Sequence, residues 1–123
     1  MNKYDLVIFD LDGVLIDSKK NMEFSWNIVR KKFKIKKNFN KYFKFLGYPF
    51  FDILKKLSIK KNLKQIQTEY NKNSIRYFNK INLYKDIQEV LKFLIKKKIK
   101  LAIVTSKNKN RTSKLVKKFK LPI

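Results

Sequence analysis

The chain has 123 residues, 44% of them hydrophobic, which suits one domain or a small domain with an insertion. It contains no Cys and no His, so disulfides, thiolate metal sites and histidine acid–base chemistry are excluded. No apolar run approaches the roughly 20 residues of a membrane span, and the N-terminal run is too short for a signal peptide. We therefore expect a soluble, cytoplasmic protein without a membrane partner.

The formal net charge is +23, from 32 Lys+Arg against 9 Asp+Glu. Such a charge is compatible with a nucleic-acid-binding surface. However, the lysines are spread along the whole chain, and the only arginines are Arg30, Arg76 and Arg111, although arginine dominates base and phosphate recognition. The excess of Lys, Asn, Ile, Phe and Tyr is typical of AT-rich coding. We favour this compositional origin and expect no specific nucleic-acid partner.

Two short apolar runs predict parallel strands. Asp5–Asp10 and Ile99–Val104 are rich in β-branched residues and read as buried strands. Apolar residues at helical spacing lie between and after them. The predicted helices run through Met22, Trp26, Val29 and Phe33 (with Asp17 or Ser18 as cap), over Phe50–Leu57 after Pro49, over Leu63–Phe78 with Asn62 as N-cap, through Ile87, Val90, Leu91 and Leu94, and through Leu115, Val116 and Phe119 after Asn108 or Asn110.

This order of elements predicts an α/β fold, because two buried parallel strands need a crossover connection. About 90 residues separate Asp10 from Ile99, far more than one crossover helix requires. We expect residues 1–17 and 83–123 to form a partial Rossmann-like core with two parallel strands. Residues 18–82 are expected to form an inserted helical subdomain.

The acids of this acid-poor chain gather after the first strand, where Asp10, Asp12 and Asp17 fall within eight residues. Asp10 ends the strand, at the sheet edge where open α/β sheets bind ligands. Two carboxylates in one pocket repel each other unless a cation is bound or one has a raised pKa. Gly13 permits a positive φ or a close backbone approach. The alternative is a turn or helix N-terminus that merely carries acids.

The run Phe9-Asp10-Leu11-Asp12-Gly13-Val14-Leu15 resembles the first motif of the haloacid dehalogenase-like (HAD) superfamily, hhhhDxDG[TV]h. Thr105, after the second apolar strand, matches the Thr or Ser of the second motif. The resemblance covers the whole chain, with the helical insert in the place of a C1-type cap. The continuation DGVLIDS is similar to the phosphoglycolate phosphatase and β-phosphoglucomutase-like subgroup.

This resemblance implies roles for individual residues. Asp10 would be the nucleophile, and Asp12 would protonate the leaving oxygen and then activate water. Mg²⁺ would be held by the Asp10 carboxylate and the Asp12 backbone carbonyl. Thr105 and backbone N–H groups around Leu11, Asp12 and Ser106 would bind the phosphoryl oxygens. Because dehalogenases of the superfamily lack the second Asp, phosphoryl transfer is favoured over dehalogenation.

The segment Gly47-Tyr48-Pro49-Phe50 lies within the expected cap. In C1-capped relatives a Gly-containing stretch there faces the active site, so Gly47, Tyr48 and Phe50 are possible substrate-facing residues. A plain turn between helices is the alternative. For Asp17 we favour a structural role at the cap hinge or the first helix.

Two family motifs have no counterpart in these residues: a third-motif Lys, and a fourth-motif acidic pair such as GDxxxD. Lys107 and Lys109 follow the second motif too closely to replace the former, and no Asp or Glu follows Thr105. We therefore expect an N-terminal portion of such a protein: a fragment, a truncated product, an incomplete record or one piece of a split enzyme. Two strands alone would leave apolar surface open.

The sequence therefore predicts a Mg²⁺-dependent phosphatase of a small phosphorylated metabolite, acting through an aspartyl-phosphate and truncated as given. A catalytically defective HAD-fold module with a binding or regulatory role, or one piece of a split enzyme, is the alternative. A basic nucleic-acid-binding protein is less favoured. Substrate identity and oligomeric state are not encoded in a recognisable pattern.

Overall fold

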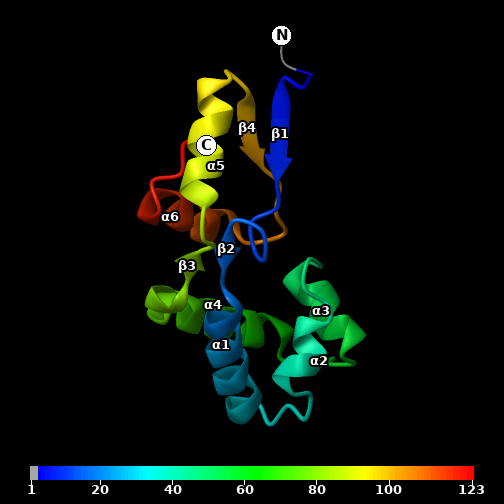
Figure 1. Cartoon of the computed structure of the whole chain (residues 1–123). Helices are drawn as coiled ribbons and strands as arrows, with labels where there is room; N and C mark the ends of the chain where they lie inside the picture. The colour runs from blue at the N-terminus through cyan, green and yellow to red at the C-terminus, as the bar shows by residue number, and fades with distance from the viewer. Residues whose placement is uncertain (1–2) are drawn as a thin grey trace. The chain divides into compact units, whose positions relative to one another are not determined.

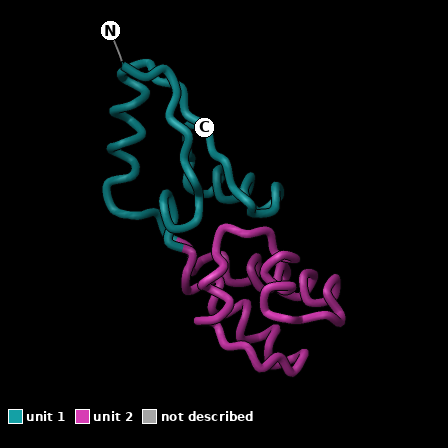
Figure 2. Tube along the Cα trace, turned by 90° about the vertical axis from the view of Figure 1, so that its right-hand side faces the viewer, with its two compact units in different colours: residues 1–17, 82–123 teal, residues 18–81 magenta. Residues whose placement is uncertain are grey.

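The computed structural model describes residues 3–123 and divides into two compact units (Figure 2). The core unit comprises Met1–Asp17 and Asn82–Ile123, and the helical unit comprises Ser18–Ile81. Across residues 3–123, every helix is too short or too polar for a transmembrane span.

The core unit is built on two parallel strands, β1 (Leu6–Phe9) and β4 (Lys100–Ile103). Their register pairs Leu6 with Lys100 and Phe9 with Ile103, and Figure 1 shows the two arrows side by side. Helix α5 (Ile87–Lys96) contacts β4, and α6 (Lys109–Lys118) follows it. The predicted α/β class with parallel strands is confirmed.

The core unit also contains a short antiparallel β-ribbon. Strand β2 (Ile16–Asp17) pairs with β3 (Asn82–Leu83), and Tyr84 N donates to Leu15 O at 3.2 Å. The sequence did not predict this ribbon, because two-residue strands carry no detectable alternation. The ribbon joins the two points at which the chain leaves and re-enters the core unit.

Burial of the first strand was predicted wrongly. Leu6 and Ile8 are 48% and 57% exposed, whereas Val7 and Phe9 are half-buried. Successive side chains of a strand point to opposite faces, so one face of β1 packs inward and the other stays open. The same holds on α5, where Leu91 is fully buried but Val90 and Phe93 are exposed. The expected open apolar surface is therefore present.

The helical unit packs four α-helices and one 3-10 turn around a core of its own. The elements are α1 (Lys19–Lys32), α2 (Phe39–Phe43), α3 (Phe50–Lys56), α4 (Leu63–Arg76) and η1 (Phe78–Lys80). Its buried cluster consists of Met22, Trp26, Val29, Phe39, Tyr42, Ile53, Leu54, Leu57, Ile66 and Tyr70. Met22, Trp26 and Val29 belong to the predicted apolar stripe of α1, so that pattern did identify core positions.

Trp26 lies at the centre of this cluster with no exposed surface. Its indole stacks on the ring of Tyr42, with centroids 4.5 Å apart. Its Nε1 donates to the carbonyl of Lys37 at 2.9 Å, so the one polar atom of the side chain is satisfied. Trp26 thereby ties α1 to α2 and to the loop between them.

A buried polar contact joins α1 to α4. Asn21 Nδ2 donates to the carbonyls of Ser74 and Tyr77, each at 2.9 Å, and Ser74 Oγ donates to Asn21 Oδ1 at 3.1 Å. Both side chains are almost fully buried. Because a buried amide without partners would be costly, these bonds specify how the two helices pair.

The helix boundaries follow the predictions more closely than the caps do. Ser18 and Asn62 occupy the N-cap positions of α1 and α4, but neither side chain makes the capping hydrogen bond. Asn62 has a positive φ of 59°, a conformation in which it is not an ordinary cap. Asn38 instead caps α2, a helix not predicted, by accepting from Lys41 N at 3.1 Å.

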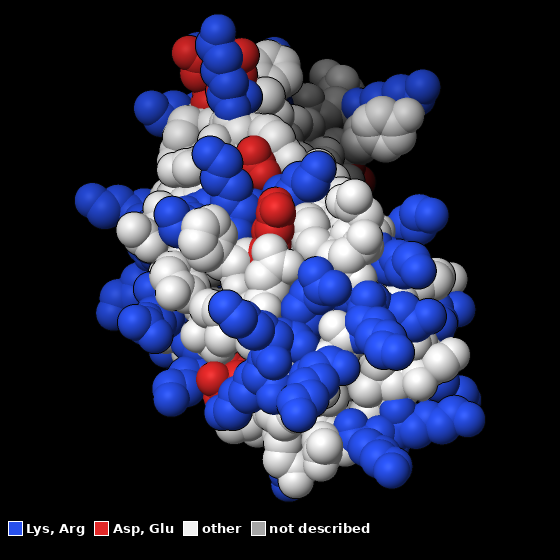
Figure 3. All heavy atoms as spheres, turned by 90° about the horizontal axis from the view of Figure 1, so that it is seen from below, with Lys and Arg blue, Asp and Glu red and all other residues white. Residues whose placement is uncertain are grey.

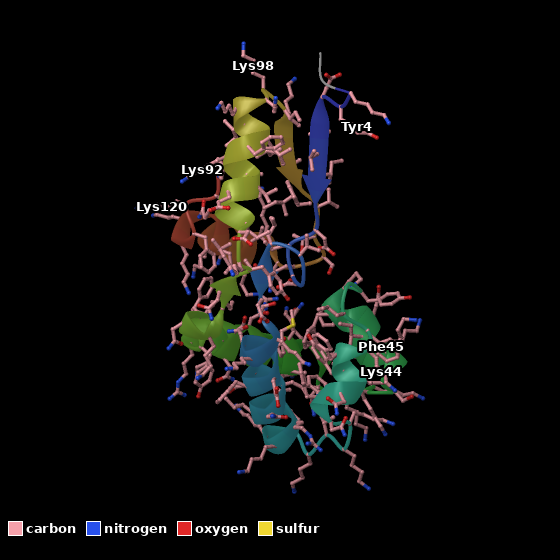
Figure 4. The ribbon with its side chains drawn as sticks, viewed as in Figure 1. Tyr4, Lys44, Phe45, Lys92, Lys98 and Lys120 are labelled. Carbon is pink, nitrogen blue, oxygen red and sulfur yellow. The ribbon has the colours of Figure 1, made fainter. Side chains whose placement is uncertain are left out.

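The surface is strongly basic. Lys and Arg side chains dominate the face shown in Figure 3, where acids are few. In Figure 4 the side chains of Lys92, Lys98 and Lys120 extend away from the ribbon of the core unit. All three lysines are exposed to solvent.

We predict that Trp26→Ala destabilises the helical unit by about 3–5 kcal/mol, because it leaves a large cavity and an unpaired carbonyl at Lys37. Urea unfolding followed by circular dichroism measures the loss, since the chain has only one Trp for fluorescence. Ile75→Ala, on the exposed side of α4, is the matched control and should change stability by less than about 0.5 kcal/mol. Equal effects of the two changes would contradict this view of the core.

Candidate active site

The candidate site lies where β1 and β4 end. The last residues of the two strands, Phe9 and Ile103, are paired, and Val104 N donates to Phe9 O at 2.9 Å. Parallel strands end at the same edge of a sheet, so the loops that begin at Asp10 and at Thr105 start side by side. The core unit alone therefore brings the two predicted motifs together.

The first loop is held by its own backbone. The carbonyl of Leu11 accepts from the N–H groups of Val14, Leu15 and Ile16 at 3.3, 3.0 and 3.1 Å. Gly13 has a φ of +81° and donates to Ile16 O at 2.9 Å. A Cβ at Gly13 would meet nothing within 4 Å, so glycine is needed for its backbone conformation and not for space.

The carboxylate of Asp10 is oriented by this loop. Its Oδ1 accepts from the N–H of Leu11 at 2.7 Å, and the residue is exposed. The Leu11 N–H, expected to face a phosphoryl oxygen, is therefore bound to Asp10 in this structure. The bond holds one carboxylate oxygen, Oδ1, against the loop backbone.

The second loop is fixed at both ends. Thr105 Oγ1 accepts from Lys107 N at 3.1 Å, which leaves its hydroxyl proton to be donated elsewhere. Asn108 caps α6 by accepting from Asn110 N at 2.9 Å and Arg111 N at 3.2 Å, as predicted. A shallow hollow of about 370 Å³ adjoins this loop, lined by Ile103, Val104, Thr105, Lys107, Lys109, Thr112 and Ser113. Ser106 is exposed.

A buried ion pair links the two loops. Lys107 Nζ lies 3.4 Å from Asp12 Oδ2, and the side chains are only 3% and 12% exposed. Burial lowers the pKa of Lys107, and the charge of Arg111 lowers it further, whereas Asp12 opposes the shift by stabilising the ammonium. Sequence reasoning set Lys107 aside as too close to the second motif, and only the side-chain packing shows where its ammonium lies.

The other predicted residues lie in the helical unit, between α2 and α3. Gly47 has a φ of +104°, as a tight turn requires. Tyr48 is exposed, and Lys56 Nζ lies 4.5 Å from its ring. Phe50, the first residue of α3, is half-buried and packs against the core of the helical unit, with its ring centroid 4.9 Å from that of Tyr70. Phe50 therefore has a packing role of its own.

Metal-ligand candidates in the core unit are few. No group of three or more acidic or other metal-binding side chains lies together within residues 3–123. Asp10 offers one carboxylate and Asp12 its backbone carbonyl, since the carboxylate of Asp12 is paired with Lys107. This donor set suits Mg²⁺, which commonly takes one or two carboxylates and completes its shell with water and substrate phosphate oxygens.

Comparison with known families agrees with this geometry. The family described as haloacid dehalogenase-like hydrolase matches residues 7–122. The chain belongs to this family. The match includes nearly all of the β1–β4 pair, both loops of the candidate site and the helical unit.

Solved structures of HAD-like proteins share the fold. A hydrolase from Pseudomonas syringae has a TM-score of 0.86 at 26% identity, over 94% of this chain and 56% of its own. A predicted phosphatase from Clostridium acetobutylicum has 0.76 at 25%, over 98% and 57%. A predicted phosphoglycolate phosphatase from Haemophilus somnus has 0.72 at 22%, over 96% and 58%.

The chain thus spans a little more than half the length of these similar structures. No curated protein matches it. The family match establishes the HAD family, and the solved structures agree with it in fold class.

We predict that Asn108→Ala costs about 1 kcal/mol of stability, because two N–H groups at the start of α6 lose their acceptor. Urea unfolding measures the loss, and amide hydrogen exchange should become faster at Asn110 and Arg111. The matched control is Asn110→Ala, two residues later, where the side chain accepts neither of these two bonds. If the two variants were equally stable, the cap would not anchor the second loop.

Proposed function

We propose that this chain carries the nucleophile half of a Mg²⁺-dependent phosphatase that acts on a small phosphorylated metabolite. The observation that carries the proposal is the meeting of Asp10, Asp12 and Thr105 at one edge of the β1–β4 pair in a HAD-family chain. Similarity to structures named as phosphatases, two of them phosphoglycolate phosphatases, supports this reaction class.

In the proposed first step, Asp10 attacks the phosphorus. Its Oδ1 is held by Leu11 N, so Oδ2 forms the new O–P bond while the bond to the leaving oxygen breaks. Asp12, when protonated, gives its proton to that leaving oxygen. The products are an aspartyl-phosphate and the free alcohol.

In the proposed second step, the Asp12 carboxylate takes a proton from water. The water oxygen attacks the phosphorus, the bond to Asp10 breaks, and inorganic phosphate leaves. Thr105 donates its hydroxyl proton to a phosphoryl oxygen, together with N–H groups of Asp12 and Ser106. Mg²⁺ bound by the Asp10 carboxylate and the Asp12 carbonyl would supply positive charge against the phosphoryl oxygens.

The helical unit is proposed to act as a cap that selects the substrate. Among its loop residues, Tyr48 offers an exposed aromatic ring for contact with a substrate, and Gly47 provides the turn that presents it. Phe50 is proposed to support this loop from within the core of the helical unit and not to touch the substrate.

We predict that beryllofluoride, which mimics a phosphoryl group on a carboxylate, binds Asp10 in the presence of Mg²⁺. Bound fluorine resonances in ¹⁹F NMR measure this binding, and Asp10→Asn should abolish them. Where an aryl phosphate is hydrolysed, the same change should lower the rate by on the order of 10³-fold or more, because the nucleophile is lost.

Asp5→Asn is the matched control for this experiment, since Asp5 precedes the other end of β1. It should leave the bound resonances unchanged. Absence of bound resonances in the unaltered chain, or their survival in Asp10→Asn, would refute the proposed nucleophile.

A further inference from the structure

The helical unit contains a hollow that takes no part in the reaction steps proposed above. The loop that follows α1 and the loop that joins α3 to α4 form its walls, and its volume is about 460 Å³. Every residue that lines it belongs to the helical unit. The shape and charge of the hollow are therefore properties of this unit alone.

Apolar side chains form one part of the lining. Leu57 and Ile66 are buried members of the core of the helical unit, and Phe33, Ile35 and Ile59 are half-buried against that core. A half-buried apolar side chain keeps part of its surface in water, and covering that surface with an apolar group is favourable. The hollow therefore offers a place for the apolar part of a ligand.

Lysines form the other part of the lining, namely Lys34, Lys36, Lys37, Lys60 and Lys61. Within residues 3–123, no Asp or Glu lines the hollow, and none of these five lysines forms an ion pair with an acid. Like charges around a concave surface with apolar walls raise the local potential, because the low dielectric constant of the walls focuses the field. The hollow therefore favours a ligand with negative charge.

Compensation of helix dipoles does not explain these five lysines. Helices α1 and α3 end at the hollow, and the carboxyl end of a helix carries partial negative charge that lysines can offset. However, their last turns already contain Lys31 and Lys32 in α1 and Lys55 and Lys56 in α3, and the lining includes none of these four. Helix α4 begins at the hollow with Asn62, and its first turn has no acid to offset the positive end of its dipole.

The backbone of both walls is held in place by hydrogen bonds. Ile35 N donates to the carbonyl of Arg30 at 2.8 Å, and Ile59 N donates to the carbonyl of Leu54 at 2.9 Å. Both helices thus end in the same way, with an apolar residue turned back toward the last helical turn. Because the walls are already ordered, a ligand would lose less free energy to the ordering of its site.

We propose that this hollow binds a small amphipathic organic anion, with an aliphatic or aromatic body that carries one carboxylate. The apolar body covers the half-buried side chains of Phe33, Ile35 and Ile59, and the carboxylate lies among the ammonium groups of the lining. A concave hollow suits a free molecule better than the flat surface of a membrane. The proposal concerns the helical unit and does not depend on the proposed phosphatase reaction.

General attraction of anions to a chain with a formal net charge of +23 is the competing explanation. It predicts that anions of equal charge bind with equal affinity, whatever their apolar part. It also predicts that removal of any three exposed lysines has the same effect. A built site in the hollow requires both an apolar body and the lysines of the lining.

Octanoate is the probe, and the indole N–H signal of Trp26 in ¹H–¹⁵N NMR spectra of the 123-residue chain is the readout. The chain has one Trp, and its Nε1 donates to the carbonyl of Lys37 in the lining at 2.9 Å, so a single signal reports on the wall of the hollow. We expect octanoate to shift this signal saturably, together with the backbone amide signals of Ile35 and Ile59.

Two further probes separate the roles of charge and apolar body. Acetate has the same charge without the body, and octanamide has the body without the charge. We expect acetate to bind at least about tenfold more weakly than octanoate, since partial burial of a few methylene groups corresponds to such a factor. Octanamide should also bind more weakly, by about tenfold, because it does not attract the ammonium groups.

A triple variant tests the lysines of the lining. Lys36→Gln, Lys60→Gln and Lys61→Gln together remove three exposed lysines without altering the carbonyl that accepts from Trp26. We expect the affinity for octanoate to fall by about tenfold, as the loss of three partly screened ion pairs implies.

The matched control removes the same charge from exposed positions elsewhere in the helical unit. Lys20→Gln, Lys44→Gln and Lys72→Gln together change no residue of the lining, and Figure 4 labels Lys44 among them. Because water and salt screen distant exposed charges, the affinity for octanoate should stay within about twofold of the unaltered chain.

Equal affinity for acetate and octanoate, equal effects of the two triple variants, or octanoate shifts confined to the core unit would overturn the proposal. The comparison of probes uses the unaltered chain, so it remains decisive even where a variant does not fold. Beryllofluoride binding at Asp10 tests a residue of the other unit, so either proposal can fail while the other stands.

Discussion

The parallel pairing of β1 with β4 brings the candidate site residues together from two distant parts of the chain. Phe9 pairs with Ile103, so the residues that follow each strand leave the same edge of the sheet. Asp10 and Asp12 come from one loop, and Thr105 and Lys107 from the other. A shift of register along either strand would separate these groups and would turn the inward-facing side chains outward. The site therefore depends on this pairing before it depends on any individual side chain.

Charge gives the site its particular character. The chain carries 32 basic side chains against 9 acidic ones. Most of the basic side chains lie in solvent, where water screens their mutual repulsion and each lowers the folding stability only slightly. Lys107 is different because it is buried against a carboxylate at the edge of the sheet. Because the dielectric constant of a buried site is low, one buried charge interacts more strongly with a neighbouring ionised group than exposed charges do. A strongly basic composition can thus coexist with a site organised around two acids.

Several features were readable from residue patterns. The spacing of Met22, Trp26 and Val29 identified the buried face of α1, and the apolar runs located both main strands to within about a residue. Asn108 and Asn110 were the two candidate caps of the last helix, and Asn108 makes the capping bonds. Ser18 and Asn62 were equally good caps by residue type but make no capping bond, because capping depends on backbone angles that the residue type does not determine. The β2–β3 ribbon and α2 are too short to produce a periodic signal.

By itself the sequence determined the family, the α/β class, and which acids belong to the candidate site, because these depend on local motifs and on period. Tertiary structure alone decided the open face of β1, the engagement of Leu11 N by Asp10, and the ion pair of Lys107 with Asp12. Each of these involves residues brought together by folding or by a side-chain rotamer. Lys107 is the clearest case: one lysine among many in the sequence, it becomes distinct only when the end of β4 is placed beside the end of β1.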